Sequence, residues 1–134
     1  MRRSIRSPGD RRGRGVRGQA AVELALVLPL LVLLALMLCQ VGLVVRDQVL
    51  VIHAAREGGR ASAVDPDPEA ARRAAVSSGS LAPDRLEVAV SGRGGPGSRV
   101  EVTVRYRSAT DLPLVGPLVG DVELSGSASM RVEK

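Results

Sequence analysis

The chain has 134 residues, with one tyrosine and no phenylalanine or tryptophan, so any folded core must be built from valine, leucine and alanine. The net charge of +5 comes from the first 18 residues, which hold seven arginines and one aspartate, whereas the rest has 12 basic and 13 acidic side chains. A nucleic-acid-binding protein carries its basic patch on the folded part, so this distribution argues against nucleic acid as a partner.

Residues 1–18 are rich in arginine, glycine and serine, and we expect them to form a disordered leader because they cannot bury an apolar face. They precede 22 uncharged residues, LALVLPLLVLLALMLCQVGLVV, at positions 24–45. That length predicts a transmembrane helix over residues 19–45, because the hydrocarbon core is about 30 Å thick and a helix rises about 1.5 Å per residue. Pro29 inside this helix predicts a kink.

The flanking charges predict the orientation. Basic residues beside a membrane span stay in the cytoplasm, and on the far side Arg46 and Asp47 cancel each other. We therefore expect a single-pass protein of the cytoplasmic (inner) membrane, with residues 1–18 in the cytoplasm and residues 46–134 on the extracytoplasmic side. A secretory signal peptide is disfavoured because no small-x-small cleavage site follows the apolar run. A lipoprotein signal at Cys39 is disfavoured because Leu38 is large.

Residues 46–134 are expected to form an extracytoplasmic α+β domain. The transmembrane helix continues through residues 46–57, with Val45, Val49 and Ile52 on one side, to a candidate stop at Gly58 and Gly59, although it could run on to Ala63. The turn signal Asp-Pro-Asp-Pro then precedes a short helix over residues 69–78.

Alternating apolar and polar residues predict three strands, at 86–90, 100–107 and 122–133, with a flexible glycine-rich hairpin loop at 92–97. A three-stranded antiparallel sheet with one apolar face is not stable alone, so we expect the outer half of the long helix to pack on it. The sequence LPLVGPLVG at 112–120 predicts either an irregular connection with its leucines under the sheet or an apolar contact site for a partner subunit or the membrane surface.

Sequence motifs of enzymes are missing from this chain. It contains no G-x-S-x-G, HExxH or CxxC sequence, and its single histidine, His53, and single cysteine, Cys39, cannot build a metal cluster. We expect His53 to be a surface or half-buried residue of the helix and Cys39 to be a small apolar side chain in the membrane. The prediction is therefore a protein that is not an enzyme, with no catalytic residue, cofactor or metal.

Glu23 is a carboxylate at the start of the apolar run, where an ionisable group usually has a partner. If the chain were cut after Gly18, the new ammonium of Gln19 would lie about one helical turn from Glu23. Glu23 of one subunit could then neutralise the ammonium of its neighbour and favour lateral packing. The alternative is an interfacial carboxylate that the helix dipole tolerates.

Residues 17–29, RGQAAVELALVLP, resemble the start of TadE-like proteins, the pilin-like components of Tad (Flp-type) pilus systems. Residues 53–60, HAAREGGR, and 127–131, SASMR, are also similar to that family. The resemblance implies a pilin-like fold in which a long helix packs on a small sheet, and a role as a minor pilin or pseudopilin in pilus assembly. Its implied partners are other pilin-like subunits and Tad assembly proteins.

The family further implies cleavage by a prepilin peptidase between Gly18 and Gln19, which makes Glu23 the fifth mature residue and the assembly carboxylate. Many type IV pilins have phenylalanine at the first mature position, where this chain has glutamine. The second reading is a plain single-pass membrane-anchored protein whose outer domain binds an envelope partner. A plain anchor should tolerate Glu23→Ala, whereas a pilin-like subunit should lose assembly.

Overall fold

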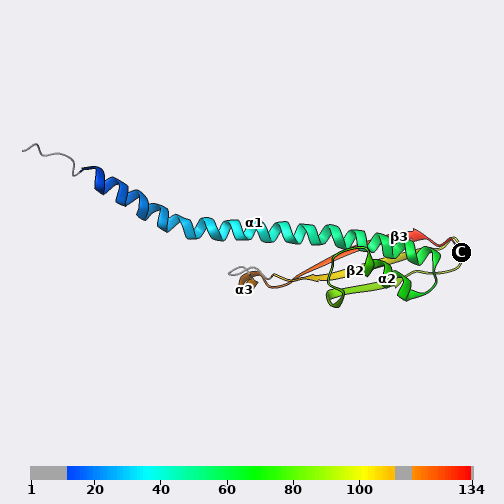
Figure 1. Cartoon of the computed structure of the whole chain (residues 1–134). Helices are drawn as coiled ribbons and strands as arrows, with labels where there is room; N and C mark the ends of the chain where they lie inside the picture. Colours follow the sequence, from blue (N-terminus) through cyan, green and yellow to red (C-terminus); the bar gives the residue numbers. More distant parts are fainter. Residues whose placement is uncertain (1–11, 111–115, 134) are drawn as a thin grey trace, which may run out of the picture. The chain divides into compact units, whose positions relative to one another are not determined.

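Figure 1 shows the computed structural model of the chain, which describes residues 12–110 and 116–133. The elements in chain order are the helices α1 (Arg12–Val64) and α2 (Pro68–Ser77), the 3-10 helix η1 (Pro83–Arg85), the strands β1 (Leu86–Ser91) and β2 (Arg99–Ser108), the one-turn helix α3 (Gly116–Val119) and the strand β3 (Val122–Arg131). The predicted α+β fold, with a long N-terminal helix, a short second helix and a three-stranded antiparallel sheet, is confirmed.

Helix α1 begins earlier and ends later than predicted. It starts at Arg12, so residues 12–18 of the predicted disordered leader are helical. Extending an existing helix costs much less than nucleating one, so a stable apolar helix readily lengthens at its end. At the other end α1 passes Gly58 and Gly59 and stops at Val64, close to the alternative end at Ala63.

Gly58 and Gly59 serve close packing rather than helix termination. A Cβ at Gly58 would lie 3.2 Å from the carbonyl oxygen of Ala71 in α2, and one at Gly59 would lie 3.3 Å from Met130 Cγ in β3. The two glycines therefore let α1 approach α2 and β3 at distances that a larger residue would not permit.

The three strands form one antiparallel sheet in the order β1-β2-β3. Leu86 of β1 and Leu124 of β3 both lie opposite Tyr106 of the central strand. The predicted alternation is confirmed on β2, where Val100, Val102 and Val104 are fully buried. On the opposite face of the strand, Glu101, Arg105 and Arg107 are exposed.

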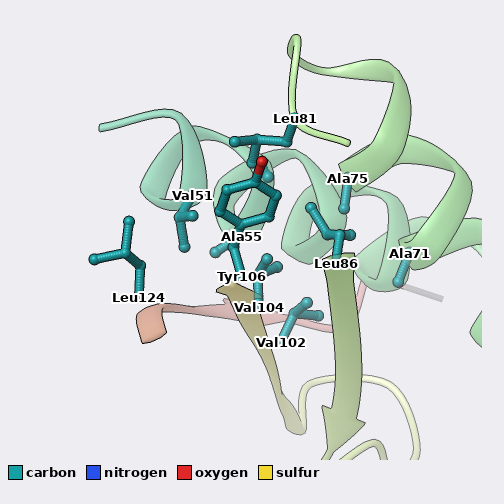
Figure 2. Close-up of a cluster of buried hydrophobic side chains, with 11 residues drawn as sticks. Val51, Ala55, Ala71, Ala75, Leu81, Leu86, Val102, Val104, Tyr106 and Leu124 are labelled. Carbon is teal, nitrogen blue, oxygen red and sulfur yellow. The ribbon is translucent and has the colours of Figure 1, made fainter. Parts of the chain in front are cut away.

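The core lies between this sheet and the two helices. Figure 2 shows Val51 and Ala55 of α1 on the side of Tyr106, and Ala71 and Ala75 of α2 beside Leu86, so both helices cover the same face of the sheet. Seven of the eleven buried side chains of this cluster are valine, leucine or tyrosine and the other four are alanine, which agrees with the near absence of aromatic residues.

The side of α1 that packs on the sheet is not the one marked by Val45 and Val49, which are 57% and 48% exposed. The buried side instead carries Val51, Ala54 and Ala55. Small side chains are favoured there because the helix lies very close to β3. A Cβ at Gly126 of β3 would stand only 3.3 Å from the Cα of Ile52.

The glycine-rich loop at 92–97 is held by hydrogen bonds and is not the free flexible loop that its composition predicts. The Arg93 guanidinium donates to the carbonyl oxygens of Ser62 and Asp65 at the end of α1. The amide of Gly97 donates to the carbonyl oxygen of Val132 at 2.9 Å. Arg93 thus satisfies carbonyl groups that the last turn of a helix leaves unpaired.

Helix α2 begins at a capped turn. Asp67 is the N-cap residue, and its Oδ1 accepts a hydrogen bond from the amide of Glu69 at 3.0 Å. Its other carboxylate oxygen lies 3.0 Å from the Arg73 guanidinium. The hydrogen bond from the Glu69 amide, and then the contact with Arg73, lower the pKa of Asp67.

The connection between β2 and β3 is only partly described. Residues 112–115 of the predicted apolar connection lie outside the described residues. Gly116–Val119 form the single helical turn α3, closed by a hydrogen bond from the Gly120 amide to the Gly116 carbonyl at 3.0 Å. An irregular path is therefore wrong for these four residues.

Candidate functional site

The N-terminal part of α1 contains all the predicted site residues. Gly18–Val64 is a helix long and apolar enough to cross a membrane. Each described side chain from residue 18 to residue 32 is exposed, leucines and valines included. Soluble monomers rarely expose so large a continuous apolar surface, so this helix indicates a single-pass membrane protein.

Gln19 and Glu23 lie together on one turn of α1. The side-chain amide of Gln19 donates to Glu23 Oε1 at 3.1 Å, and the pair is exposed. The contact follows from the sequence, because residues four apart face each other along a helix. The pairing of Glu23 with an ammonium group at Gln19 of a neighbouring subunit stays a prediction.

Gly18 precedes this pair and does not pack closely against another part of the chain. A Cβ built at Gly18 would meet no atom within 4 Å. A small residue there is therefore not explained by the described structure, and leader cleavage after Gly18 stays a prediction.

Pro29 lies six residues beyond Glu23 and away from the pair, and α1 continues through it. The kink at Pro29 also stays a prediction.

Cys39 and His53, the single residues of their kinds, are both exposed on α1. His53 borders an open groove that Glu57 of α1 and Ala74 of α2 also line. The predicted helix-surface position of His53 is confirmed. Within residues 12–110 and 116–133, no cluster of three or more His, Cys, Asp or Glu side chains could hold a metal ion.

The solvent face of the sheet is charged and presents a possible contact surface. Glu87 of β1 lies opposite Arg105 of β2, and Arg107 of β2 lies opposite Glu123 of β3. These residues line a shallow pocket of about 110 Å³ together with Asp84. Opposite charges across neighbouring strands stabilise the sheet, and they also offer both signs of charge to a partner.

Gln40 is a structural residue that the sequence alone did not single out. Its side chain is only 5% exposed, although the neighbouring side chains Leu38 and Val41 on α1 are exposed. Its amide donates to Thr110 Oγ1 at 3.2 Å, and the Thr110 hydroxyl donates to the carbonyl oxygen of Gly120 at 2.5 Å. A glutamine inside an apolar run is the available signal, but its partner 70 residues away follows only from the tertiary fold.

Comparison with known proteins gives one match. The family model described as TadE-like protein matches residues 18–60, the segment that includes Gly18, Gln19 and Glu23. No curated protein and no solved structure is significantly similar to the chain. The TadE-like family is related to pilus assembly and is not a family of enzymes, so the match indicates involvement in Tad pilus-related assembly. The resemblance of this chain to the TadE-like family is therefore confirmed over residues 18–60.

Proposed function

We propose that this protein is a TadE-like minor pilin or pseudopilin that takes part in assembly of a Tad/Flp-type pilus. The observation that carries the proposal is the Gln19–Glu23 pair, 3.1 Å apart at the start of an exposed apolar helix, within the segment that matches the family. The protein acts by packing against other subunits, and its own residues perform no chemistry.

Lateral packing of α1 with other pilin-like helices in the membrane is the central step. A prepilin peptidase cuts after Gly18 and leaves an ammonium group on Gln19. In a row of parallel helices, Glu23 of one subunit neutralises the ammonium of the next. Because an unpaired charge is costly in the hydrocarbon region, this pairing favours one stagger between neighbours. The exposed side chains of residues 18–32 supply the apolar contact surface for the packing.

The proposed orientation follows from the charges on either side of the span. The arginine-rich leader lies in the cytoplasm, α1 crosses the inner membrane, and the sheet lies on the extracytoplasmic side. There the charged sheet face around Arg105 and Arg107 contacts Tad assembly proteins at the base or tip of the pilus. Arginines at such a surface favour docking of planar acidic groups.

Leader cleavage is tested by the intact mass and N-terminal sequence of the full-length protein purified from membranes of its native host. We expect the mature chain to begin at Gln19. Gly18→Ala should be processed and Gly18→Val should not, and neither change disturbs packing because Gly18 has no neighbour within 4 Å. An intact leader in the wild-type protein would favour a permanent membrane component or a plain anchor, and a start beyond Val45 would mean a secreted protein.

The role of Glu23 is tested by Glu23→Gln, which keeps the side-chain size and removes the charge. Removing one partner of a buried ion pair costs about 3–5 kcal/mol, so we expect assembled pili to fall by more than about tenfold. Glu69→Gln, an equivalent change at an exposed acid of α2, is the matched control and should assemble normally. Normal assembly of the Glu23 variant would favour the plain anchor with an envelope partner.

A further inference from the structure

Gln40 faces protein in a stretch of α1 where the neighbouring side chains are exposed. Leu38 and Val41 are 65% and 60% exposed, whereas Gln40 between them is buried. The compact outer unit begins at Leu36, well inside the apolar run at 24–45. The last turns of that run therefore belong to the folded domain.

Two polar contacts hold the end of the β2–β3 hairpin against these turns. At the first, Gln40 donates to Thr110, which in turn donates to the carbonyl oxygen of Gly120. At the second, the Ser108 hydroxyl donates to the Asp47 carboxylate at 2.7 Å. Ser108 and Thr110 thus lie beside α1 from Asp47 back to Gln40, about 10 Å along the helix at 1.5 Å per residue.

This geometry conflicts with a hydrocarbon layer that extends to Val45. The hairpin end has an exposed carboxylate at Asp121 and backbone groups outside regular secondary structure around Gly120. Lipid-exposed irregular backbone does not occur in the hydrocarbon region, because its amide and carbonyl groups would lack partners. The helix does not need residues 40–45 to span the bilayer, since residues 19–39 already reach about 30 Å.

We propose that the outer hydrocarbon boundary crosses α1 at Gln40, and that the contacts of Gln40 and Thr110 set it there. Residues 40–45 then lie in one of the two layers of lipid headgroups. Together these two layers make up the difference between the whole bilayer, about 40–45 Å thick, and its hydrocarbon core of about 30 Å. The helix from Gln40 to Val45 rises about 7 Å, which matches the thickness of one headgroup layer. Arg46 and Asp47 emerge into water, and Thr110, Gly120 and Asp121 are the part of the outer domain that contacts phospholipid headgroups.

This inference requires only a membrane-spanning α1, so it holds for a plain anchor as well as for a pilus subunit. It also gives a role to the polar residue that interrupts the apolar run. The exposed Val41 and Val45 then occupy a layer that accepts apolar side chains, and Gln40 directs its amide to Thr110 instead of to the lipid tails.

The depth of individual residues in the bilayer tests the proposal. The full-length protein carrying Cys39→Ser is reconstituted into vesicles of phosphatidylethanolamine and phosphatidylglycerol, with one spin label at Leu38, Val41, Val45 or Val49. These sites share one exposed side of α1, and Leu30 provides the hydrocarbon reference. Collision rates with oxygen and with a water-soluble nickel complex report the depth of each label.

We expect the Leu38 label at hydrocarbon depth and the Val41 and Val45 labels in the headgroup layer. A boundary at Arg46 instead would place the Val41 and Val45 labels about 9 Å deeper, and that result would overturn the proposal. Thr110→Val keeps the side-chain shape and removes both hydrogen bonds, so the Val45 label should move deeper. Thr103→Val in β2 is the control and should leave the depth unchanged. An unchanged depth in Thr110→Val would show that these contacts do not set the boundary.

Discussion

Gly126 is a residue whose role depends entirely on the distance between β3 and α1. A Cβ at this position would lie 3.3 Å from the backbone nitrogen and the Cα of Ile52, and 3.3 Å from Val51 Cγ1. Backbone atoms cannot rotate away as a side chain can, so a larger residue must push the helix off the strand. Gly126 thereby sets how closely the helix covers the sheet.

Gly126→Val should therefore destabilise the outer domain by about 1–3 kcal/mol, the usual cost of overpacking a core. Thermal unfolding of the full-length protein in detergent, followed by circular dichroism, measures the loss. Ser127→Val is the matched control, because its side chain points to solvent from the same strand and a β-branched residue suits a strand. Equal stability of the two variants would contradict the close approach of α1 to β3.

At the scale of one element, α2 depends on its N-terminal cap. The helix has ten residues, a length that is marginal in isolation, so capping and packing must support it. Asp67 accepts the Glu69 amide hydrogen and pairs with Arg73, and both contacts favour its charged form.

The lowered pKa of Asp67 makes this support dependent on pH. A carboxyl whose pKa is lower in the folded protein stabilises the fold above its ordinary value of 3.8, and the effect is lost as pH falls through the lowered pKa. The protection of the α2 amides in the full-length protein, measured as the exchange rate relative to the intrinsic rate at each pH, should be constant above about pH 5 and fall in acid.

Asp67→Asn provides the control for the pH effect. The asparagine oxygen can still accept the Glu69 amide hydrogen, but the side chain does not titrate. The variant should show weaker protection of α2 near neutral pH, because it lacks the charge that faces Arg73, and little further loss on acidification. The same acid response in both proteins would mean that another group is responsible.

At the scale of the whole molecule, the hydrophobic core of the outer domain depends on α1, which covers one face of the sheet. Val51, Ala54 and Ala55 of α1 are fully buried against side chains from β2 and α2, and α1 also supplies Ala63 to a second apolar cluster around Val100. The apolar face of such a small sheet must be buried against another element, and α1 and α2 provide that cover.

A fragment that begins at Leu36 should consequently keep the fold, whereas one that begins at Glu57 should not. The first retains the whole compact unit and the second lacks Val51, Ala54 and Ala55. Dispersed amide signals in a nitrogen–proton correlation spectrum, recorded in detergent, distinguish a folded fragment from an unfolded one. A well-dispersed spectrum from the shorter fragment would show that the sheet and α2 fold without α1.

The sequence by itself determined the helices α1 and α2, the three strands and their order, but not η1 or α3. The uncharged run at 24–45 indicated the spanning helix because hydrocarbon thickness fixes the length of such a run. Period-two alternation located the three strands to within two residues at each end, and it identified the buried face of β2, because side chains alternate across a strand. The Gln19–Glu23 contact was also readable, since it depends only on spacing along one helix.

Only the tertiary structure decided which residues of distant elements meet. The packing side of α1 carries alanine and glycine, which have little apolar signal, so Val45 and Val49 pointed to the wrong side. Gly58 and Gly59 looked like a helix end because the sequence does not distinguish a glycine that permits close packing from one that terminates a helix. Gln40 with Thr110, and Arg93 with the end of α1, are contacts between residues far apart in sequence, and local periodicity has no information about them.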